Sequence, residues 1–221
     1  AIDALTLYFE FQELMPVGAE GDVVIQRLAD RLVALDLLGR AAELLDHQLK
    51  YRLRGVEMAR VGTRLAIIQL MNGSPNGAIR ALRRSRLKNM PEDLLVQRRH
   101  IRVRALADLG RIEDAMKRLV GDNSADAELL RADVAWRAGN WREVAEATER
   151  LLELTPIKRP VSSFASRHLL RYAVALALAD DPDGPQRPNR PLPPAIPADP
   201  NRPASHLLPT DTASPPARSR P

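Results

Sequence analysis

The chain has 221 residues, of which 45% are hydrophobic, 28% are charged and only 4% are aromatic, and its formal net charge is +5. Few aromatic residues and few β-branched runs disfavour strand-rich folds. The absence of cysteine excludes disulfides, thiolate nucleophiles and thiolate metal sites. The longest apolar stretch, residues 169–179, contains Arg171 and is shorter than the roughly 20 residues of a membrane span.

Four short breaks divide the chain into segments with helical periodicity. They lie at Gly39, Gly73, Gly110 and Gly139, so the glycines are 34, 37 and 29 residues apart. A period near 34 residues is typical of stacked helix-turn-helix repeats. The pattern therefore predicts an all-α fold of about four helix pairs.

The apolar spacing and the capping residues place the predicted helices along the chain. Asp22, Ser74 and either Asn123 or Ser124 are expected N-caps, and Pro75 and Pro91 are expected at first helical positions. The predicted helices cover residues 2–14, 22–37, 41–53, 57–71, a segment beginning at Pro75, 94–108, 112–120, a segment from the Asn123 or Ser124 cap to Ala138, 141–154 and 162–179. The first and last of these flank the pairs.

Residues 133–156 resemble a tetratricopeptide repeat (TPR). The Gly139-Asn140-Trp141 turn, Val144 and Pro156 fall at the spacing of that family. In the same frame the small position of the second helix is occupied by Leu44, Ala78 and Ala115, and its next packing position by Leu82 and Leu119. Leu44 is large for this position, and the third repeat is about five residues short. The resemblance extends over residues 23–156, and these Arg-rich, Ala/Leu-rich repeats are similar to those of bacterial proteins.

The resemblance implies a right-handed α-α superhelix over residues 1–181, with a concave groove that binds a peptide or partner protein. An inert, solvated face is the alternative for the groove positions. Trp141 is expected in the core, whereas Trp136 at the groove edge could pack or contact a partner. The residues transferred to the groove are Gln26, Val33, Arg60, Thr63, Ile67, Gln97, His100, Arg104, Asp126, Asp133, Trp136 and Arg137.

A basic segment, residues 80–104, carries nine Lys or Arg against Glu92 and Asp93. It supports an alternative function, binding of nucleic acid or another polyanion. No aromatic residue interleaves the arginines to stack bases. Arg98 and Arg102 lie on the apolar face of the predicted helix at 94–108, and their guanidinium groups are expected to pair with acids on neighbouring helices. A structural role or an acidic protein partner is the favoured interpretation.

No pattern in the sequence indicates catalysis, a metal or a cofactor. The histidines are isolated, with no second histidine at ligand spacing, and no carboxylate pair stands out. Gly18, Gly21 and Asp22 follow a helix and lack the Lys-Ser or Lys-Thr of a phosphate-binding loop. We expect a non-catalytic interaction scaffold without cofactor or membrane span, in a compartment that the sequence leaves open.

The segment 182–221 contains 13 of the 18 prolines and almost no apolar residues. This composition predicts a disordered or polyproline tail. Because the repeat-like pattern stops abruptly near Asp181, we expect that the native reading frame ends there. Helical character from residue 2 without an initiator methionine leads us to expect a piece of a longer protein.

Overall fold

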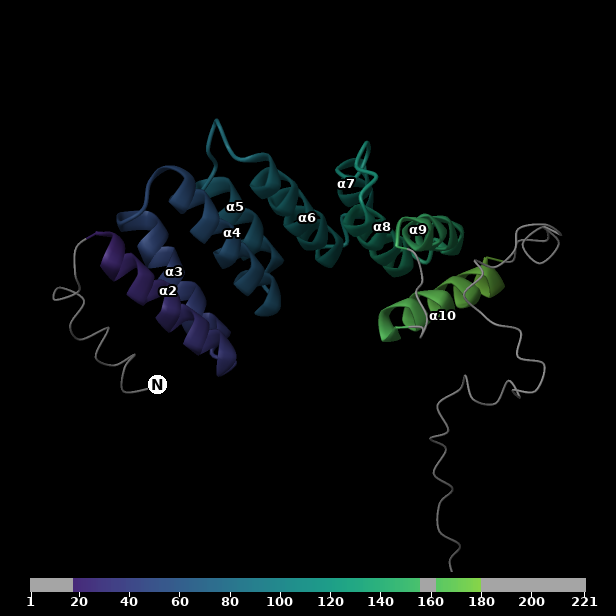
Figure 1. Ribbon diagram of the computed structural model, residues 1–221, viewed down its shortest axis with the longest axis horizontal. Coiled ribbons are helices and arrows are strands. Elements are labelled where there is room, and N and C mark those ends of the chain that lie inside the picture. Colours follow the sequence, from purple (N-terminus) through teal and green to yellow (C-terminus); the bar gives the residue numbers. More distant parts are fainter. Residues whose placement is uncertain (1–17, 156–161, 180–221) are drawn as a thin grey trace, which may run out of the picture.

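The computed structural model describes residues 18–155 and 162–179 (Figure 1). The predicted helix at 2–14 and the predicted tail at 182–221 lie outside these residues. The described residues form nine helices and contain no strand. The helices are α2 Ala19–Ala34, α3 Leu38–Tyr51, α4 Gly55–Met71, α5 Pro75–Arg84, α6 Glu92–Asp108, α7 Ile112–Lys117, α8 Ala125–Arg137, α9 Trp141–Leu154 and α10 Ser163–Leu178.

Three of the described helices, α8, α9 and α10, begin at a side-chain cap, whereas the predicted cap Asp22 lies inside α2, whose N-cap is Gly18. The Ser124 hydroxyl accepts a hydrogen bond from the Ala127 amide, and Ser162 caps α10 in the same way. Ser74 precedes α5 without a side-chain bond, and Pro91 lies one position before the first helical residue rather than within it. The predicted helix at 112–120 ends at Lys117, so α7 is shorter than expected.

The four turns between paired helices share one backbone geometry, and this corrects the position of the first turn. The residue with positive φ is Asp36 in the first turn and Gly73, Gly110 and Gly139 in the others, whereas Gly39 lies inside α3. In each turn the next amide donates a hydrogen bond back to the preceding helix, which is a Schellman cap. These bonds are Leu37 to Leu32, Ser74 to Gln69, Arg111 to Leu106 and Asn140 to Ala135, at 2.8 to 3.0 Å.

The turns are more evenly spaced along the sequence when Asp36, rather than Gly39, is taken as the first turn residue. The spacings become 37, 37 and 29 residues. The positions seven before and five after each turn residue are fully buried and small or medium in size, so paired helices can cross closely. These residues are Ala29, Ala66, Val103 and Ala132 on the first helices, and Ala41, Ala78, Ala115 and Val144 on the second. Ala41 therefore occupies the small position of the second helix that was predicted for Leu44.

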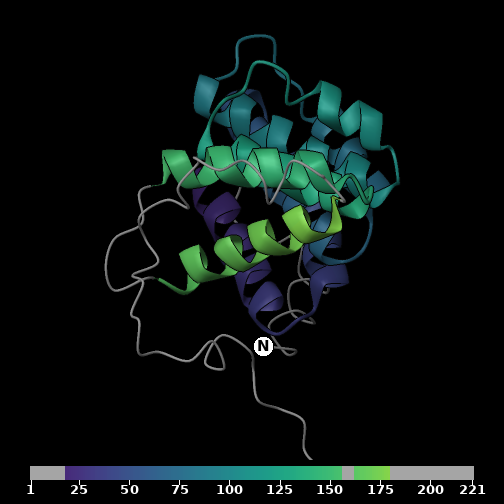
Figure 2. The ribbon, with the colours of Figure 1, turned by 90° about the vertical axis from the view of Figure 1, so that its right-hand side faces the viewer.

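The helices pack in sequence order and form an elongated row from α2 to α10 (Figure 1). Viewed from the α10 end, the earlier helices lie behind α9 and α10 (Figure 2). Each helix packs on the next, and α6 also contacts both α4 and α8. Because α4, α6 and α8 are the first helices of successive pairs, these first helices lie side by side.

The buried side chains follow the row in three clusters. The largest extends from Ile25 in α2 to Ala105 in α6. A second joins α6, α7 and α8 around Leu119, and a smaller one joins α8, α9 and α10 around Val144 and Ala175. Leu45 and Leu151, which would meet in a compact bundle, belong to distant parts of this row.

One arginine is buried at the junction of α4, α5 and α6. Arg98 is only 8% exposed, and its guanidinium donates to the carbonyls of Ala59 and Leu82 at 2.9 and 2.5 Å. It also donates to the hydroxyls of Thr63 and Ser85 at 2.8 and 3.1 Å. The prediction that Arg98 pairs with an acid is wrong, because its hydrogen-bond acceptors are neutral and include a carbonyl at the negative end of α5. Arg102 is exposed.

Close contact between α4 and α5 requires a glycine. A Cβ added to Gly62 would lie 2.1 Å from the Ser85 hydroxyl oxygen and 2.2 Å from its Cβ. The same Ser85 hydroxyl donates to the Ala81 carbonyl at 2.7 Å and accepts from Arg98. Gly62 therefore lets α5 approach α4 closely enough for Arg98 to bridge both helices.

Candidate functional site

A cleft of about 560 Å³ lies between α6, α8 and α10. Helix α10 takes the place that the first helix of a further pair would occupy, and α6, α8 and α10 each supply a stripe of residues from one helix face. The stripes are Arg104 and Ala107 from α6, Leu130, Asp133, Val134, Trp136 and Arg137 from α8, and Arg167, Leu170, Arg171 and Val174 from α10. The same side of each first helix therefore lines the cleft.

Ion pairs join the three helices along the cleft. Asp133 of α8 lies between Arg104 of α6, whose Nη2 is 3.9 Å from its Oδ2, and Arg171 of α10, whose Nη1 bonds its Oδ1. Arg171 also donates to the carbonyl of Ala132 at 2.7 Å. A second pair joins Arg137 of α8 to Asp108 of α6 at 2.5 Å. These contacts hold the three stripes at a fixed spacing.

Opposite charges at equivalent positions produce this arrangement. Arg104 and Asp133 each lie six residues before their turn glycine, and Asp108 and Arg137 each lie two residues before it. Neighbouring first helices therefore carry opposite charges at equivalent positions along their axes.

Trp136 forms the edge of the cleft and is 37% exposed. Its ring lies 5.1 Å from that of Trp141 in an edge-to-face arrangement, and the Arg171 guanidinium lies 5.1 Å from its centroid. Trp136 therefore packs on one part of its ring and is open on another, and its contact with a partner stays a prediction. Trp141 is partly buried against the α9–α10 cluster.

The structure brings four of the predicted groove residues together in the cleft: Arg104, Asp133, Trp136 and Arg137. Four others are exposed but lie outside it. They are Arg60, which is 3.6 Å from Glu57, Ile67, which is 36% exposed, Gln97 and Asp126.

Two predicted groove residues on first helices point into the molecule. Thr63 is 2% exposed, donates to the Ala59 carbonyl at 2.7 Å and accepts from Arg98, so it is inaccessible to a partner. The side chain of His100 is 15% exposed and is engaged by Asp122. Both lie ten residues before their turn glycine, a position that faces the neighbouring helices.

In the first pair the groove positions lie three residues earlier than predicted, because the turn is at Asp36 rather than Gly39. Gln26 and Val33, the predicted groove residues, are both half-buried, and Val33 packs against the core. The positions equivalent to those used in the later pairs are Val23 and Asp30, which are both exposed.

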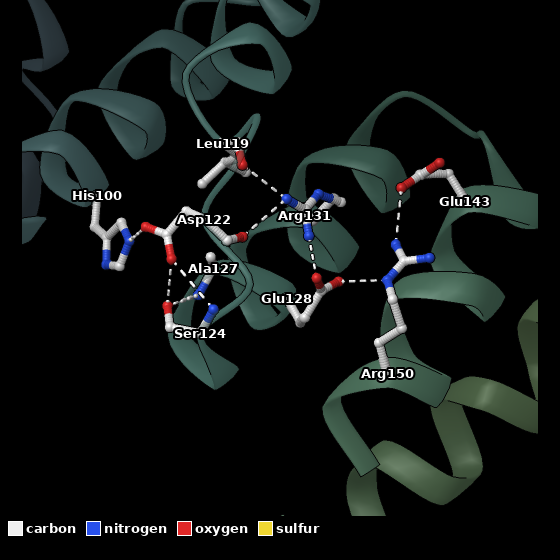
Figure 3. A network of polar contacts seen from close by, with 9 residues as sticks. All are labelled: His100, Leu119, Asp122, Ser124, Ala127, Glu128, Arg131, Glu143 and Arg150. Carbon is white, nitrogen blue, oxygen red and sulfur yellow. Dashed lines mark hydrogen bonds and ion pairs between the residues drawn. The ribbon is translucent and has the colours of Figure 1, made fainter. Parts of the chain in front are cut away.

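A polar network connects α6 to α8 and α9 (Figure 3). Asp122 accepts from His100 Nε2 at 2.9 Å with one oxygen and from the Ser124 hydroxyl at 2.7 Å with the other. Burial would raise the pKa of Asp122, but the hydrogen bonds from Ser124 and His100 outweigh it and lower the pKa to about 2.

The order of these three side chains decides what they can do. In a nucleophile-activating triad the histidine lies between the hydroxyl and the carboxylate. Here the carboxylate lies between the other two, and the Ser124 oxygen accepts from the Ala127 amide as a helix cap (Figure 3). The arrangement therefore fixes the start of α8 rather than activating Ser124.

The remainder of the network is centred on Glu128, whose side chain is 3% exposed. It binds Arg131 on its own helix and Arg150 of α9, which also lies 3.3 Å from Glu143 (Figure 3). Arg131 in turn donates to the carbonyls of Leu119 and Asp122 at 2.8 and 3.2 Å. These contacts attach the α7–α8 connection to the fourth helix pair.

Sequence reasoning missed the α10 side of the cleft. Arg167, Leu170, Arg171 and Val174 were not predicted, because the repeat resemblance ended at residue 156 and α10 was interpreted as a flanking helix. Their helical spacing, which matches that of the α8 stripe, is a signal that could have identified them.

In comparisons with known proteins, no family model and no curated protein matched this chain. Within residues 18–155 and 162–179, no helix is long and apolar enough to cross a membrane. The same residues contain no group of three or more histidine, aspartate or glutamate side chains placed to hold a metal ion.

Proposed function

We propose that this chain is a TPR-like array with a right-handed superhelical path, and that it works as a scaffold that holds a peptide or partner protein on its concave face. The repeated small positions and the shared Schellman turns support the repeat assignment. The contacts of α6 with α4 and α8 support a path in which the first helices line the inner side.

The observation that carries the proposal is the cleft itself. Equivalent faces of α6, α8 and α10 meet there, and apolar side chains remain open in it, with Leu170 57% and Val174 36% exposed. Exposed apolar groups within a hollow and surrounded by polar residues are characteristic of interaction sites.

The test is selection of random displayed peptides on the immobilised chain, followed by binding measurements on two variants. Leu170→Glu places a charge in the cleft, whereas Val120→Glu makes the same type of change at a side chain that is 79% exposed and outside it. We expect selected peptides to lose binding to Leu170→Glu and keep it for Val120→Glu. Equal binding to both variants would contradict the proposal.

A second candidate function is polyanion binding by the basic segment. Partial desolvation of the largely exposed Arg102 lowers its pKa, and the nearby charges of Arg118, Arg111 and Arg86 lower it further, which indicates a cluster of arginines away from the cleft. The segment offers fewer cations than its sequence implies, because Arg98 is buried and Arg84 bonds Asp46 at 2.6 Å.

Retention of single-stranded nucleic acid over a salt series tests this candidate. A steep loss with salt, and loss in an Arg86→Glu, Arg102→Glu variant but not in Arg142→Glu, would support it. Weak retention that is the same in all three proteins would reject it.

A further inference from the structure

We propose that the cleft between α6, α8 and α10 binds an acidic peptide segment in which carboxylates flank apolar side chains. This inference rests on the scaffold function proposed above and names the chemistry of its partner.

The first argument is an excess of positive charge. The cleft is lined by four arginines and one carboxylate. That carboxylate, Asp133, is already shared by Arg104 and Arg171, and Arg137 is bound by Asp108. Arg167 is exposed and forms no ion pair within the described residues. An anionic partner is therefore attracted to the cleft, and a cationic one is repelled.

The second argument is the apolar floor. Leu170 and Val174 are exposed in the cleft, beside the open edge of Trp136. A small inorganic anion would satisfy the arginines but leave these surfaces in water. A peptide that carries both carboxylates and apolar side chains covers them and gains the free energy of apolar burial.

The third argument is the placement of the arginines on opposite walls. Arg104 comes from α6 and Arg167 from α10, while α8 lies between these helices, as the contacts of Asp133 with both neighbours require. The side chain of Arg104 is 53% exposed. Carboxylates on both sides of an apolar anchor can thus reach one arginine on each wall.

A peptide fits this cleft better than a nucleic acid does. Binding of single strands relies on aromatic side chains that stack on the bases. The only aromatic residue in the cleft lining is Trp136, and its ring is already engaged by Arg171 and Trp141. The remaining floor is aliphatic.

The experiment uses a short fluorescein-labelled synthetic peptide with two leucines flanked on each side by glutamates, and its glutamine analogue. Binding is followed by fluorescence anisotropy and by the emission of the chain's two tryptophans, Trp136 and Trp141, since Trp136 borders the cleft. The variants are Arg167→Glu in the cleft and Arg80→Glu as an exposed control outside it.

We expect the glutamate peptide to bind the unaltered chain at least about tenfold more tightly than the glutamine analogue, with a change in tryptophan emission. Arg167→Glu should weaken binding about tenfold, Arg80→Glu should leave it unchanged, and Leu170→Glu should abolish it. Rising salt should weaken binding, because the Debye length falls from about 30 Å at 0.01 M to about 8 Å at 0.15 M.

The remaining outcomes separate the inference from the function on which it rests. If both peptides bind equally and Leu170→Glu abolishes binding, the acidic partner is wrong and the scaffold stands. Failure of the glutamate peptide to bind, or binding unaffected by Arg167→Glu, also overturns the inference, and the display selection then decides the scaffold function separately. Displacement of the peptide by an oligonucleotide, with loss of oligonucleotide binding in Arg167→Glu, would overturn it in favour of a polyanion.

Discussion

The two ends of the row share one backbone frame but differ in the share of apolar and polar contacts between their helices. From α2 to α5 and onto α6, one continuous apolar cluster joins consecutive helices. From α6 to α10, two smaller clusters are supplemented by buried polar networks around Asp122 and Glu128 and by the ion pairs of the cleft. Polar contacts also occur in the first half, where Arg52 bonds Asp22 and Arg98 bonds two carbonyls, but the apolar clusters are smaller on the side of the candidate site.

Equivalent positions show the difference directly. Six and two residues before the turn, α4 carries Ile67 and Met71, which are 36% and 56% exposed. At the same positions α6 and α8 carry charged residues that pair across the cleft. A repeat frame therefore fixes where side chains lie, whereas their chemistry sets what each part of the surface can bind.

The largest expected effect lies in the apolar half. Gly62→Ala places a methyl group against Ser85, so α5 must move away from α4 and from Arg98. We expect a loss of about 3 kcal/mol in the free energy of unfolding, measured with urea.

The matched control is Gly39→Ala, in the first turn of α3. A Cβ there meets no atom within 4 Å, so the substitution should leave stability unchanged or raise it by up to about 1 kcal/mol. Equal effects of the two substitutions would mean that α4 and α5 do not approach as closely as described.

Arg98→Met tests the junction between the two halves. The methionine fills much of the space but leaves the Leu82 carbonyl without its side-chain donor, and the Ala59 carbonyl keeps only the Thr63 hydroxyl as a side-chain donor. We expect a loss of about 2 kcal/mol in urea unfolding, because buried hydrogen bonds to charged groups contribute about 1.5 to 3 kcal/mol. A variant as stable as the unaltered chain would show that these carbonyls find other donors.

Acid should weaken the polar half first. The pKa of Asp122 is lowered to about 2 in the folded chain, below its usual value of 3.8. The carboxylate therefore contributes stability above about pH 4, and this contribution, about 2 kcal/mol, is lost as the pH falls through 2. Hydrogen exchange of the α8 amides should report the loss.

Asp122→Asn is the control for that pH dependence. It removes the titrating group, so exchange at the start of α8 should be faster at neutral pH and should change less between pH 4 and pH 2. An unchanged acid profile in this variant would assign the effect to other carboxylates.

The smallest effect is expected at the cleft rim. The Arg137 side chain in the Asp108–Arg137 pair is 51% exposed, and exposed pairs contribute about 0 to 1 kcal/mol. Asp108→Asn should therefore cost no more than about 0.5 kcal/mol in thermal or urea unfolding. A loss of several kcal/mol would indicate that the rim pairs, rather than the apolar clusters, hold the first helices together.

The all-helical fold, most helix boundaries and the buried second-helix positions could be predicted, because periodicity and capping are local in sequence. The first turn could not be placed, since aspartate adopts the left-handed conformation far less often than glycine and Gly39 lies nearby. Because the turn was predicted three residues too late, the groove residues of the first pair were misplaced and Leu44 was assigned to a small position that Ala41 occupies.

Tertiary contacts account for the remaining differences at the site. Nothing local distinguishes Thr63, which bonds Arg98 from a distant helix, from the exposed Arg60 one turn earlier. The contribution of α10 to the cleft depends on its docking beside α8 through Arg171, a contact between residues 38 apart in sequence. Contacts between residues so far apart in sequence depend on how the helices pack, so local sequence patterns do not predict them.

The position of Asp133 between two arginines has a consequence for assembly. A chain of look-alike helix pairs can stack them in the wrong order, or exchange them with another molecule, while still burying apolar surface. If α10 docked directly on α6, Arg171 would face Arg104 without the aspartate between them, and the two charges would repel. The alternating charges thus favour one order of stacking along the row.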